Sequence, residues 1–301
     1  MTKSRDAALA ATGVLVVCCA HASGATIFAL EAMGPFNAGT TGDRLIRFDS
    51  SDPANVAVLG ETNWSGFMTG LDFTPDGNLW ASGLSSDFTT SVLHQIDAAT
   101  GNASAVGAIS GLLGDDTIDD ITYNPADGQM YGVSLVSNAI YVINTASAQA
   151  SFVGQVSGLP SNFGGTGLAA ASSGMMYLVD IETNAVHAID GSLNVVTTRN
   201  LGFDAEFDQG LVVDWSRDDM GYAATFEDGV FDGTAAHLLT FDAGFGPLQD
   251  AGVIGPGIPD PNSGMDFFAP VDVAILPLPA PGTSAALLIA GVAIVRRGRG
   301  R

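Results

Sequence analysis

The chain has 301 residues, of which 47% are hydrophobic, and its formal net charge at pH 7 is −22. So large a hydrophobic share excludes an intrinsically disordered chain, and the excess of acidic groups excludes nucleic acid as a partner, because phosphates carry the same sign. Both cysteines, Cys18 and Cys19, lie near the N-terminus, so the rest of the chain has no disulfide to stabilise it.

The first 22 residues have the three parts of a secretory signal peptide. Lys3 and Arg5 precede an apolar stretch over residues 9–20, and the small residues of Ala20-His21-Ala22 supply a cleavage site. The stretch is shorter than the about 20 apolar residues that a membrane-spanning helix needs. We therefore expect residues 1–22 to be a signal peptide, and the protein to be exported through the secretion translocon.

The body of the protein, residues 23–275, is strongly acidic. It contains 31 acidic residues, four arginines and no lysine, which gives a formal net charge of −27. Such a surface attracts divalent cations or cationic partners. The same composition is typical of proteins adapted to salty water, where ions screen the repulsion between like charges. Both interpretations stay open.

Short segments of alternating apolar and polar residues recur along the body and predict an all-β repeat. Residues 71–80 read as a strand, a Pro-Asp-Gly turn and a second strand, and similar hairpins start at residues 121, 168 and 211. Each hairpin precedes a third strand and a short fourth strand. Four strands in a repeat of 43 to 50 residues are typical of a β-propeller blade.

The two ends of the body together supply one more blade. Residues 26–30, 44–49 and 56–60 match the second, third and fourth strands of a blade, and residues 264–268 match the missing innermost strand. A ring that closes in this way leaves no free strand edge. We therefore expect a propeller of about five blades, because a β-sandwich, the competing architecture, does not explain the unequal end blocks.

The blade pattern resembles a known group of propellers. The sequence Leu93-His94-Gln95-Ile96-Asp97, whose Leu-x-x-Ile-Asp pattern recurs, is followed by Thr100-Gly101. In this it resembles extracellular propellers of the NHL and YVTN type. That resemblance implies the fold and an extracellular setting, but no particular activity, because these families host many functions.

The last 26 residues, 276–301, combine a stiff start, an apolar middle and a basic end. Residues 277–282 are rich in proline, residues 283–295 are apolar, and arginines follow at positions 296, 297, 299 and 301. Arginines after an apolar helix hold that end on the cytoplasmic side of a membrane. A simple tail anchor has the same charge pattern.

This C-terminal layout resembles the PEP-CTERM sorting signal, in which a proline-containing motif, a transmembrane helix and an arginine cluster are recognised by an exosortase-type membrane protease. The motif here is Pro279-Ala280-Pro281, with alanine in place of the usual glutamate, and the cluster begins with Arg296 and Arg297. The resemblance implies an exosortase-like protease as a partner. It also implies delivery to the cell surface, the outer membrane or the extracellular matrix.

The three histidines of the body are His94, His187 and His237. Counted back from the acidic or amide residue that ends each third strand, His94 and His187 share the position of Ile46, Tyr141 and Leu239. We expect this row to pack between blades, because histidines in blades that are not neighbours do not reach one metal ion.

Candidate site residues lie at the inner strands, which line the central channel of a propeller. Asp72, Asp120 and Asp266 fall at or beside the starts of inner strands, and three carboxylates at one channel mouth suit Ca²⁺, which takes six to eight oxygen ligands. Propeller lactonases use that arrangement. Trp64, in a loop before an inner strand, is the candidate aromatic contact for a ligand.

The motifs of common catalytic sites are absent from the sequence: it has no Gly-x-Ser-x-Gly elbow, no phosphate-binding loop and no His-Glu-x-x-His. We therefore expect a non-catalytic binding or structural protein, with extracellular polysaccharide as a partner. The alternative is a calcium-dependent hydrolase or lactonase with its site at the channel mouth.

Overall fold

A computed structural model describes residues 24–31, 43–202, 210–225, 236–242, 246–255 and 270–278. The expected signal peptide and the sorting motif lie outside these residues. The described part consists of strands joined by turns and contains no helix, so none there is long and apolar enough to cross a membrane.

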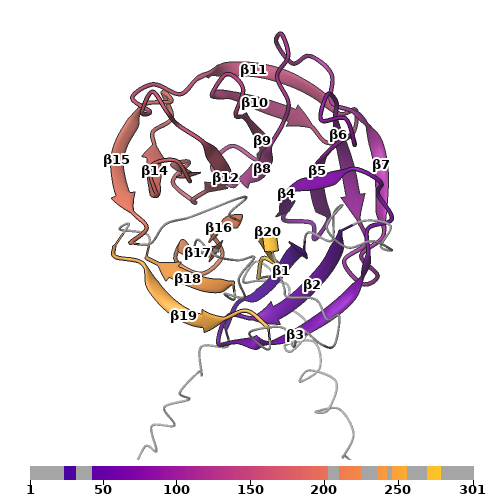
Figure 1. Cartoon of the computed structure of the whole chain (residues 1–301), viewed down its shortest axis with the longest axis vertical. Coiled ribbons are helices and arrows are strands. Elements are labelled where there is room, and N and C mark those ends of the chain that lie inside the picture. The colour runs from indigo at the N-terminus through magenta and orange to yellow at the C-terminus, as the bar shows by residue number, and fades with distance from the viewer. Residues whose placement is uncertain are drawn as a thin grey trace, which may run out of the picture.

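Five four-stranded antiparallel sheets surround a central axis as the blades of a propeller (Figure 1). Blades 2 to 5 each use four consecutive strands, numbered outward from the axis. Blade 2 contains β4 (Phe67–Phe73), β5 (Leu79–Leu84), β6 (Ser91–Ile96) and β7 (Ala103–Ala108). Blade 3 contains β8 (Asp120–Asn124), β9 (Gln129–Ser134), β10 (Ala139–Asn144) and β11 (Gln149–Gln155). Blade 4 contains β12 (Gly165–Ala170), β13 (Met176–Asp180), β14 (Ala185–Ile189) and β15 (Val195–Asn200). Blade 5 contains β16 (Gly210–Asp214), β17 (Met220–Thr225), β18 (His237–Phe241) and β19 (Gln249–Val253).

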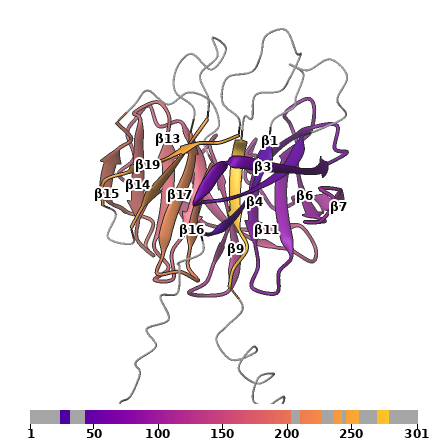
Figure 2. The ribbon, with the colours of Figure 1, turned by 90° about the horizontal axis from the view of Figure 1, so that it is seen from below.

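Blade 1 closes the ring with strands from both ends of the body. Its order from the axis is β20 (Pro270–Ile275), β1 (Thr26–Glu31), β2 (Arg44–Asp49) and β3 (Asp52–Glu61). Figure 2 shows β20 running along the axis beside β1. The prediction of five blades with shared closure is confirmed.

The closing strand itself was predicted in the wrong place. Residues 264–268, which resemble the start of blade 2, lie outside the described residues, and β20 lies a few residues further along the chain. Both segments place an aspartate among apolar residues, so the local pattern fits either one. The pairing with β1, in which Val273 lies opposite Ala29, decides between them.

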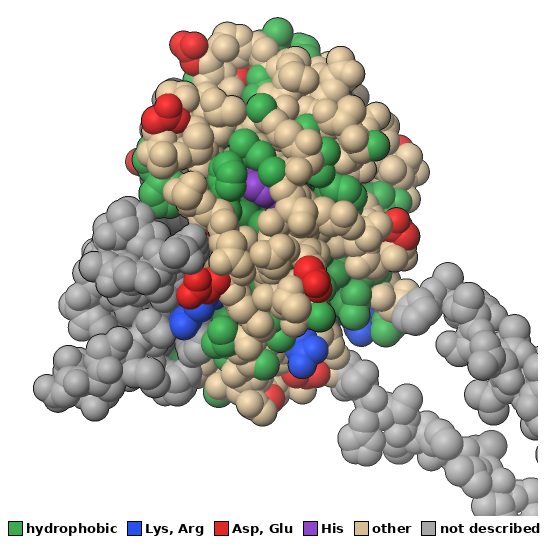
Figure 3. All heavy atoms as spheres, turned by 90° about the vertical axis from the view of Figure 1, so that its right-hand side faces the viewer, with side chains coloured by type: hydrophobic (Ala, Val, Ile, Leu, Met, Phe, Trp, Pro, Cys, Tyr) green, Lys and Arg blue, Asp and Glu red, His purple; other side chains and the backbone are tan. Residues whose placement is uncertain are grey.

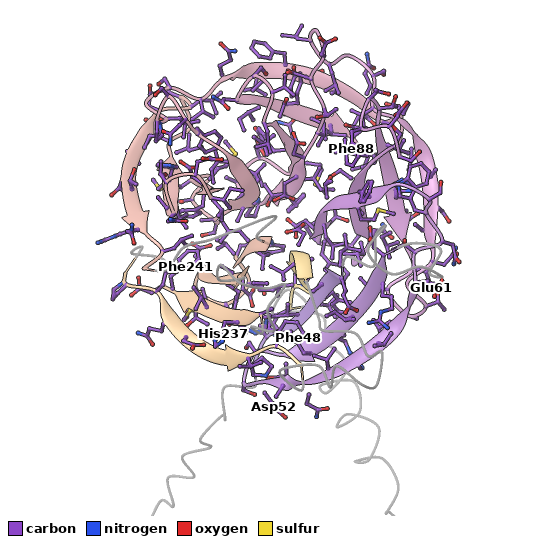
Figure 4. The ribbon with its side chains drawn as sticks, in the orientation of Figure 1. Phe48, Asp52, Glu61, Phe88, His237 and Phe241 are labelled. Atoms are coloured by element: carbon purple, nitrogen blue, oxygen red, sulfur yellow. The ribbon has the colours of Figure 1, made fainter. Side chains whose placement is uncertain are left out.

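The core consists of five clusters of buried apolar side chains, one at each junction between neighbouring blades. Phe48 packs between blades 5 and 1, Tyr141 between blades 2 and 3, and Phe241 between blades 4 and 5. The outermost strands are mostly exposed; Asp52 and Glu61 mark the two ends of one of them, β3 (Figure 4). Because each blade is a single sheet without a core of its own, its apolar side chains are buried by packing against the neighbouring blades.

The predicted histidine row is confirmed by the strand register. In each blade, one residue of the third strand pairs with the equivalent position of the second strand. These residues are Ile46, His94, Tyr141, His187 and Leu239. All five are buried between blades. Figure 3 views the ring edge-on, from the right-hand side of Figure 1, and on this side acidic side chains are scattered between hydrophobic and uncharged ones and do not gather in one patch.

Candidate functional site

The inner strands place one residue of each blade at the same level beside the axis. We define the level by strand register: its members pair with equivalent positions of the second strands. In blade order they are Asp272, Gly70, Asp120, Gly167 and Gly210. This level therefore has two carboxylates and three glycines, and Gly70 lies between the two carboxylates in blade order. Asp72 lies two residues further along β4 and forms a second level.

These carboxylates accept hydrogen bonds from the backbone of the next blade. The Leu71 N–H of blade 2 donates to Asp272 Oδ2, and the Leu168 N–H of blade 4 donates to Asp120 Oδ2. Inner strands have one free edge, whose N–H groups have no partner strand and cost free energy when they are buried without an acceptor. Each aspartate thus satisfies an edge donor and links two blades.

Asp72 does the same at the junction between blades 2 and 3. Its Oδ2 accepts the Tyr123 N–H at 2.7 Å and the Thr122 hydroxyl at 3.0 Å, while its Oδ1 accepts the N–H of Phe73 at 2.7 Å. Among the described residues, aspartates of the inner strands therefore join blades 1 to 2, 2 to 3 and 3 to 4. At the other two junctions the equivalent inner-strand positions are glycine, alanine or valine.

Asp120 and Asp272 meet beside Gly70, which has no side chain to separate them. A Cβ atom at Gly70 would lie 2.7 Å from Asp120 Oδ1 and 2.6 Å from the Ile121 nitrogen. Burial raises the pKa of both carboxyls, and the negative charge of Asp272 raises that of Asp120 further. Asp272 Oδ1 is buried and accepts no bond from a backbone or hydroxyl donor. The glycine is therefore what allows two acids from blades 1 and 3 to form one pair.

Burial dominates the protonation of all three groups. It raises the pKa of Asp72 to about 7 despite the hydrogen bonds that it accepts. It raises the pKa of Asp120 and of Asp272 well above the usual range, and the negative charge of each neighbouring carboxylate adds to the effect. At neutral pH this set therefore carries fewer negative charges than its three carboxyls suggest.

The predicted calcium ligands are only partly brought together. Asp72 and Asp120 both reach the axis, but at different levels and on different backbone partners, and Asp266 lies outside the described residues. Asp272, which sequence reasoning missed, is the residue that pairs with Asp120. Within the described ranges, no group of three or more His, Cys, Asp or Glu side chains is arranged to hold a metal ion.

Trp64, the predicted ligand contact, packs inward between blades 1 and 2. Its indole ring lies edge-on to His94, with ring centroids 4.5 Å apart and an interplanar angle of 63°. Its Nε1 is buried and has no hydrogen-bond partner, and neither ring nitrogen of His94 has one. In this arrangement the indole N–H does not face a ligand arriving from solvent.

Comparison with known proteins finds one family that matches part of the chain, and several similar solved structures. A family described as Domain of unknown function (DUF4394) matches residues 93–169, from the third strand of blade 2 to the inner strand of blade 4. No curated protein matches the chain significantly.

Several solved structures are similar. A protein of unknown function from Bacteroides thetaiotaomicron has a TM-score of 0.50 at 14% identity, over 86% of this chain and 68% of that one. A putative 6-phosphogluconolactonase from Bacteroides uniformis has a TM-score of 0.45 at 14% identity, over 78% and 84% of the two chains. A virginiamycin B lyase from Staphylococcus aureus has a TM-score of 0.39 at 13% identity, over 69% of this chain. The chain spans only 62% of that lyase. At 14% identity, the likeness to the Bacteroides thetaiotaomicron protein concerns the fold alone.

Proposed function

We propose that this protein is an exported β-propeller of the cell surface or extracellular matrix, and that it acts as a non-catalytic binding or structural component. The observation that carries the proposal is the use of the axial carboxylates. Asp72, Asp120 and Asp272 each accept a backbone hydrogen bond from a neighbouring blade, so they serve the closed ring. This leaves the outer faces and grooves of the propeller for contact with partners.

The ends of the chain support export and sorting. The expected signal peptide delivers the body to the translocon, and the motif at residues 279–281 resembles a site for an exosortase-like protease. The segment after β20 runs beside blade 5, where the Leu278 N–H donates to Ser216 Oγ at 3.0 Å. An attachment at the motif would hold the propeller close to the strand that closes its ring.

The alternative is a calcium-dependent hydrolase or lactonase with its site at the channel mouth. The raised pKa values of the axial aspartates favour it, because perturbed carboxyls in one cluster are typical of acid–base sites. Against it, the oxygens of Asp72 and Asp120 are occupied by N–H and hydroxyl donors of the protein itself.

Two measurements on the native protein test the proposal. Cell fractionation and intact-mass analysis are expected to find the protein at the surface, without residues 1–22 and without the terminal arginines. A cytoplasmic protein, or a mature chain ending in Arg301, would contradict export with sorting. Assay of the purified protein against a panel of lactones and esters is expected to show no turnover, and turnover that requires Ca²⁺ would establish the alternative.

A further inference from the structure

A groove of about 350 Å³ lies between blades 3 and 4, away from the axial carboxylates. The β8–β9 turn and Tyr131 of β9 form its wall on blade 3. The β12–β13 and β14–β15 turns form its wall on blade 4. Its volume lies in the lower part of the range for small-molecule sites. Nothing in the inter-blade bonding described above uses this space.

Small residues let the two walls approach each other closely at this junction. Gly174 faces Ala126 across it, with a backbone φ of +82° that favours glycine, and a Cβ atom on Gly174 would lie 3.1 Å from the Ala126 Cβ. At the next junction the corresponding turns are tied together, because the N–H and hydroxyl of Ser172 donate to the two oxygens of Asp219 at 2.7 and 2.5 Å. Among the described residues, no such bond ties the β8–β9 turn to the β12–β13 turn; bonds between blades 3 and 4 at this junction join Ser157, after β11, to the backbone of Leu193 and Val195.

Two carboxylates on opposite walls are held in fixed positions. Tyr131 donates its hydroxyl to Asp127 Oδ2 at 2.6 Å, which fixes both side chains on the blade 3 wall. On the blade 4 wall, Asp190 accepts the Ser192 N–H, the Asn194 N–H and the Asn194 amide, all on Oδ1, at 2.9, 2.9 and 3.3 Å. Those bonds leave Asp190 Oδ2 as an acceptor for a ligand.

Apart from the uncharged polar residues Asn124 and Ser173, the rest of the lining is glycine, apolar or aromatic. Val153 is 47% exposed, and Met175 and the ring of Tyr131 are half-buried beside it. No lysine or arginine lines the groove. Carboxylate acceptors without a cation repel anions and accept hydrogen bonds from hydroxyl or amino groups, while an aromatic ring beside aliphatic groups suits the apolar face of a small ring.

We propose that this groove binds a neutral or amino-bearing sugar residue of a polysaccharide, with Asp190 Oδ2 as its principal acceptor. The inference rests on the proposed function and deepens it, since it gives the binding protein a site and a ligand class. Uronic acid and phosphate-bearing polysaccharides are disfavoured, because the groove and the body around it are negatively charged.

The variant Asp190→Asn tests the site without removing the turn. Asn144 holds the corresponding β10–β11 turn in blade 3, where its Oδ1 accepts the Ala146 and Ser147 N–H groups at 3.0 and 3.2 Å. Asparagine at 190 therefore keeps the turn and replaces the free acceptor with a donor. The matched control is Asp87→Asn in the β5–β6 loop of blade 2, where Ser85 and Thr89 likewise bond only to Oδ1.

Calorimetric titration of the purified protein with oligosaccharides gives the readout. The panel contains neutral gluco-, galacto- and manno-oligosaccharides, glucosamine oligosaccharides, and oligogalacturonate. We expect at least one neutral or amino-bearing member to bind, oligogalacturonate to fail, Asp190→Asn to weaken binding at least tenfold, and Asp87→Asn to leave it unchanged.

Two outcomes overturn the inference, and they differ in what they leave standing. Binding that survives Asp190→Asn places the saccharide elsewhere and keeps the proposed binding function. If the unaltered protein binds none of the oligosaccharides, the groove is not a sugar site. Whether the protein is found at the cell surface then decides whether it can still be a structural component there.

Discussion

Replacing His94 with leucine is expected to stabilise the protein. His94 is 1% exposed, and neither of its ring nitrogens has a hydrogen-bond partner. A buried polar group without a partner costs about 1–3 kcal/mol. Leu239 fills the same position in blade 5, so the propeller already accommodates leucine at this level.

The gain is expected to depend on pH. Burial lowers the pKa of His94 from 6.5 to about 4. Between these values the unfolded chain binds a proton that the folded protein does not, so the stability of the folded state falls as pH drops below 6.5. At pH 5 this adds about 2 kcal/mol to the advantage of leucine, because one pKa unit corresponds to about 1.4 kcal/mol. Near pH 8 the histidine is neutral in both states, so the stability gained by His94→Leu comes only from removing the two unpaired ring nitrogens.

Urea unfolding followed by tryptophan fluorescence, at pH 5 and pH 8, measures both effects. The matched control is His187→Leu, at the same level of blade 4, where the ring bonds to Thr198 Oγ1 at 2.9 Å and Asp180 Oδ2 at 3.2 Å. That variant is expected to lose stability, because it removes both bonds. The reasoning is refuted if His94→Leu is destabilised at both pH values, or if its gain is no larger at pH 5.

Two further predictions concern the axis. In the His94→Leu background, the free energy of unfolding is expected to fall as pH rises from 5 to 7.5. Burial raises the pKa of Asp72 to about 7, so in this pH range the folded protein binds more protons than the unfolded chain. Urea titrations measure the profile, and a free energy of unfolding that stays constant or rises across this range argues against buried acids. Gly70→Ala is expected to cost about 1–3 kcal/mol through crowding against Asp120 and the backbone of the next blade. Gly191→Ala, whose Cβ would meet nothing within 4 Å, is its control, and equal midpoints for the two variants would contradict the close approach at Gly70.

The blades could be predicted from sequence because each one repeats a local pattern of strand and turn. Alternation of apolar residues, together with turn sequences such as Pro75-Asp76-Gly77, fixes these elements without knowledge of their neighbours. The closing strand could not be placed by the same means, since two adjacent segments carry similar patterns. Only the pairing of Val273 with Ala29 distinguishes them.

The candidate site was harder to predict than the fold because its contacts join residues far apart in the chain. The pairing of Asp120 with Asp272 depends on a bare glycine at position 70 and on ring closure. The histidines show the same limit. His94 and His187 occupy one row, yet of the two only the ring of His187 has hydrogen-bond partners, which come from β13 and β15.

Thermal melting with Ca²⁺ or EGTA tests most directly the claim that the axial carboxylates hold the blades together and do not bind a metal. Ionic strength is matched with NaCl, because salt alone screens the repulsion within so acidic a body. The account predicts the same Tm in CaCl₂, in EGTA and in matched NaCl. A Tm that rises with CaCl₂ to saturation, returns to its starting value with EGTA, and no longer responds in Asp120→Asn would contradict it.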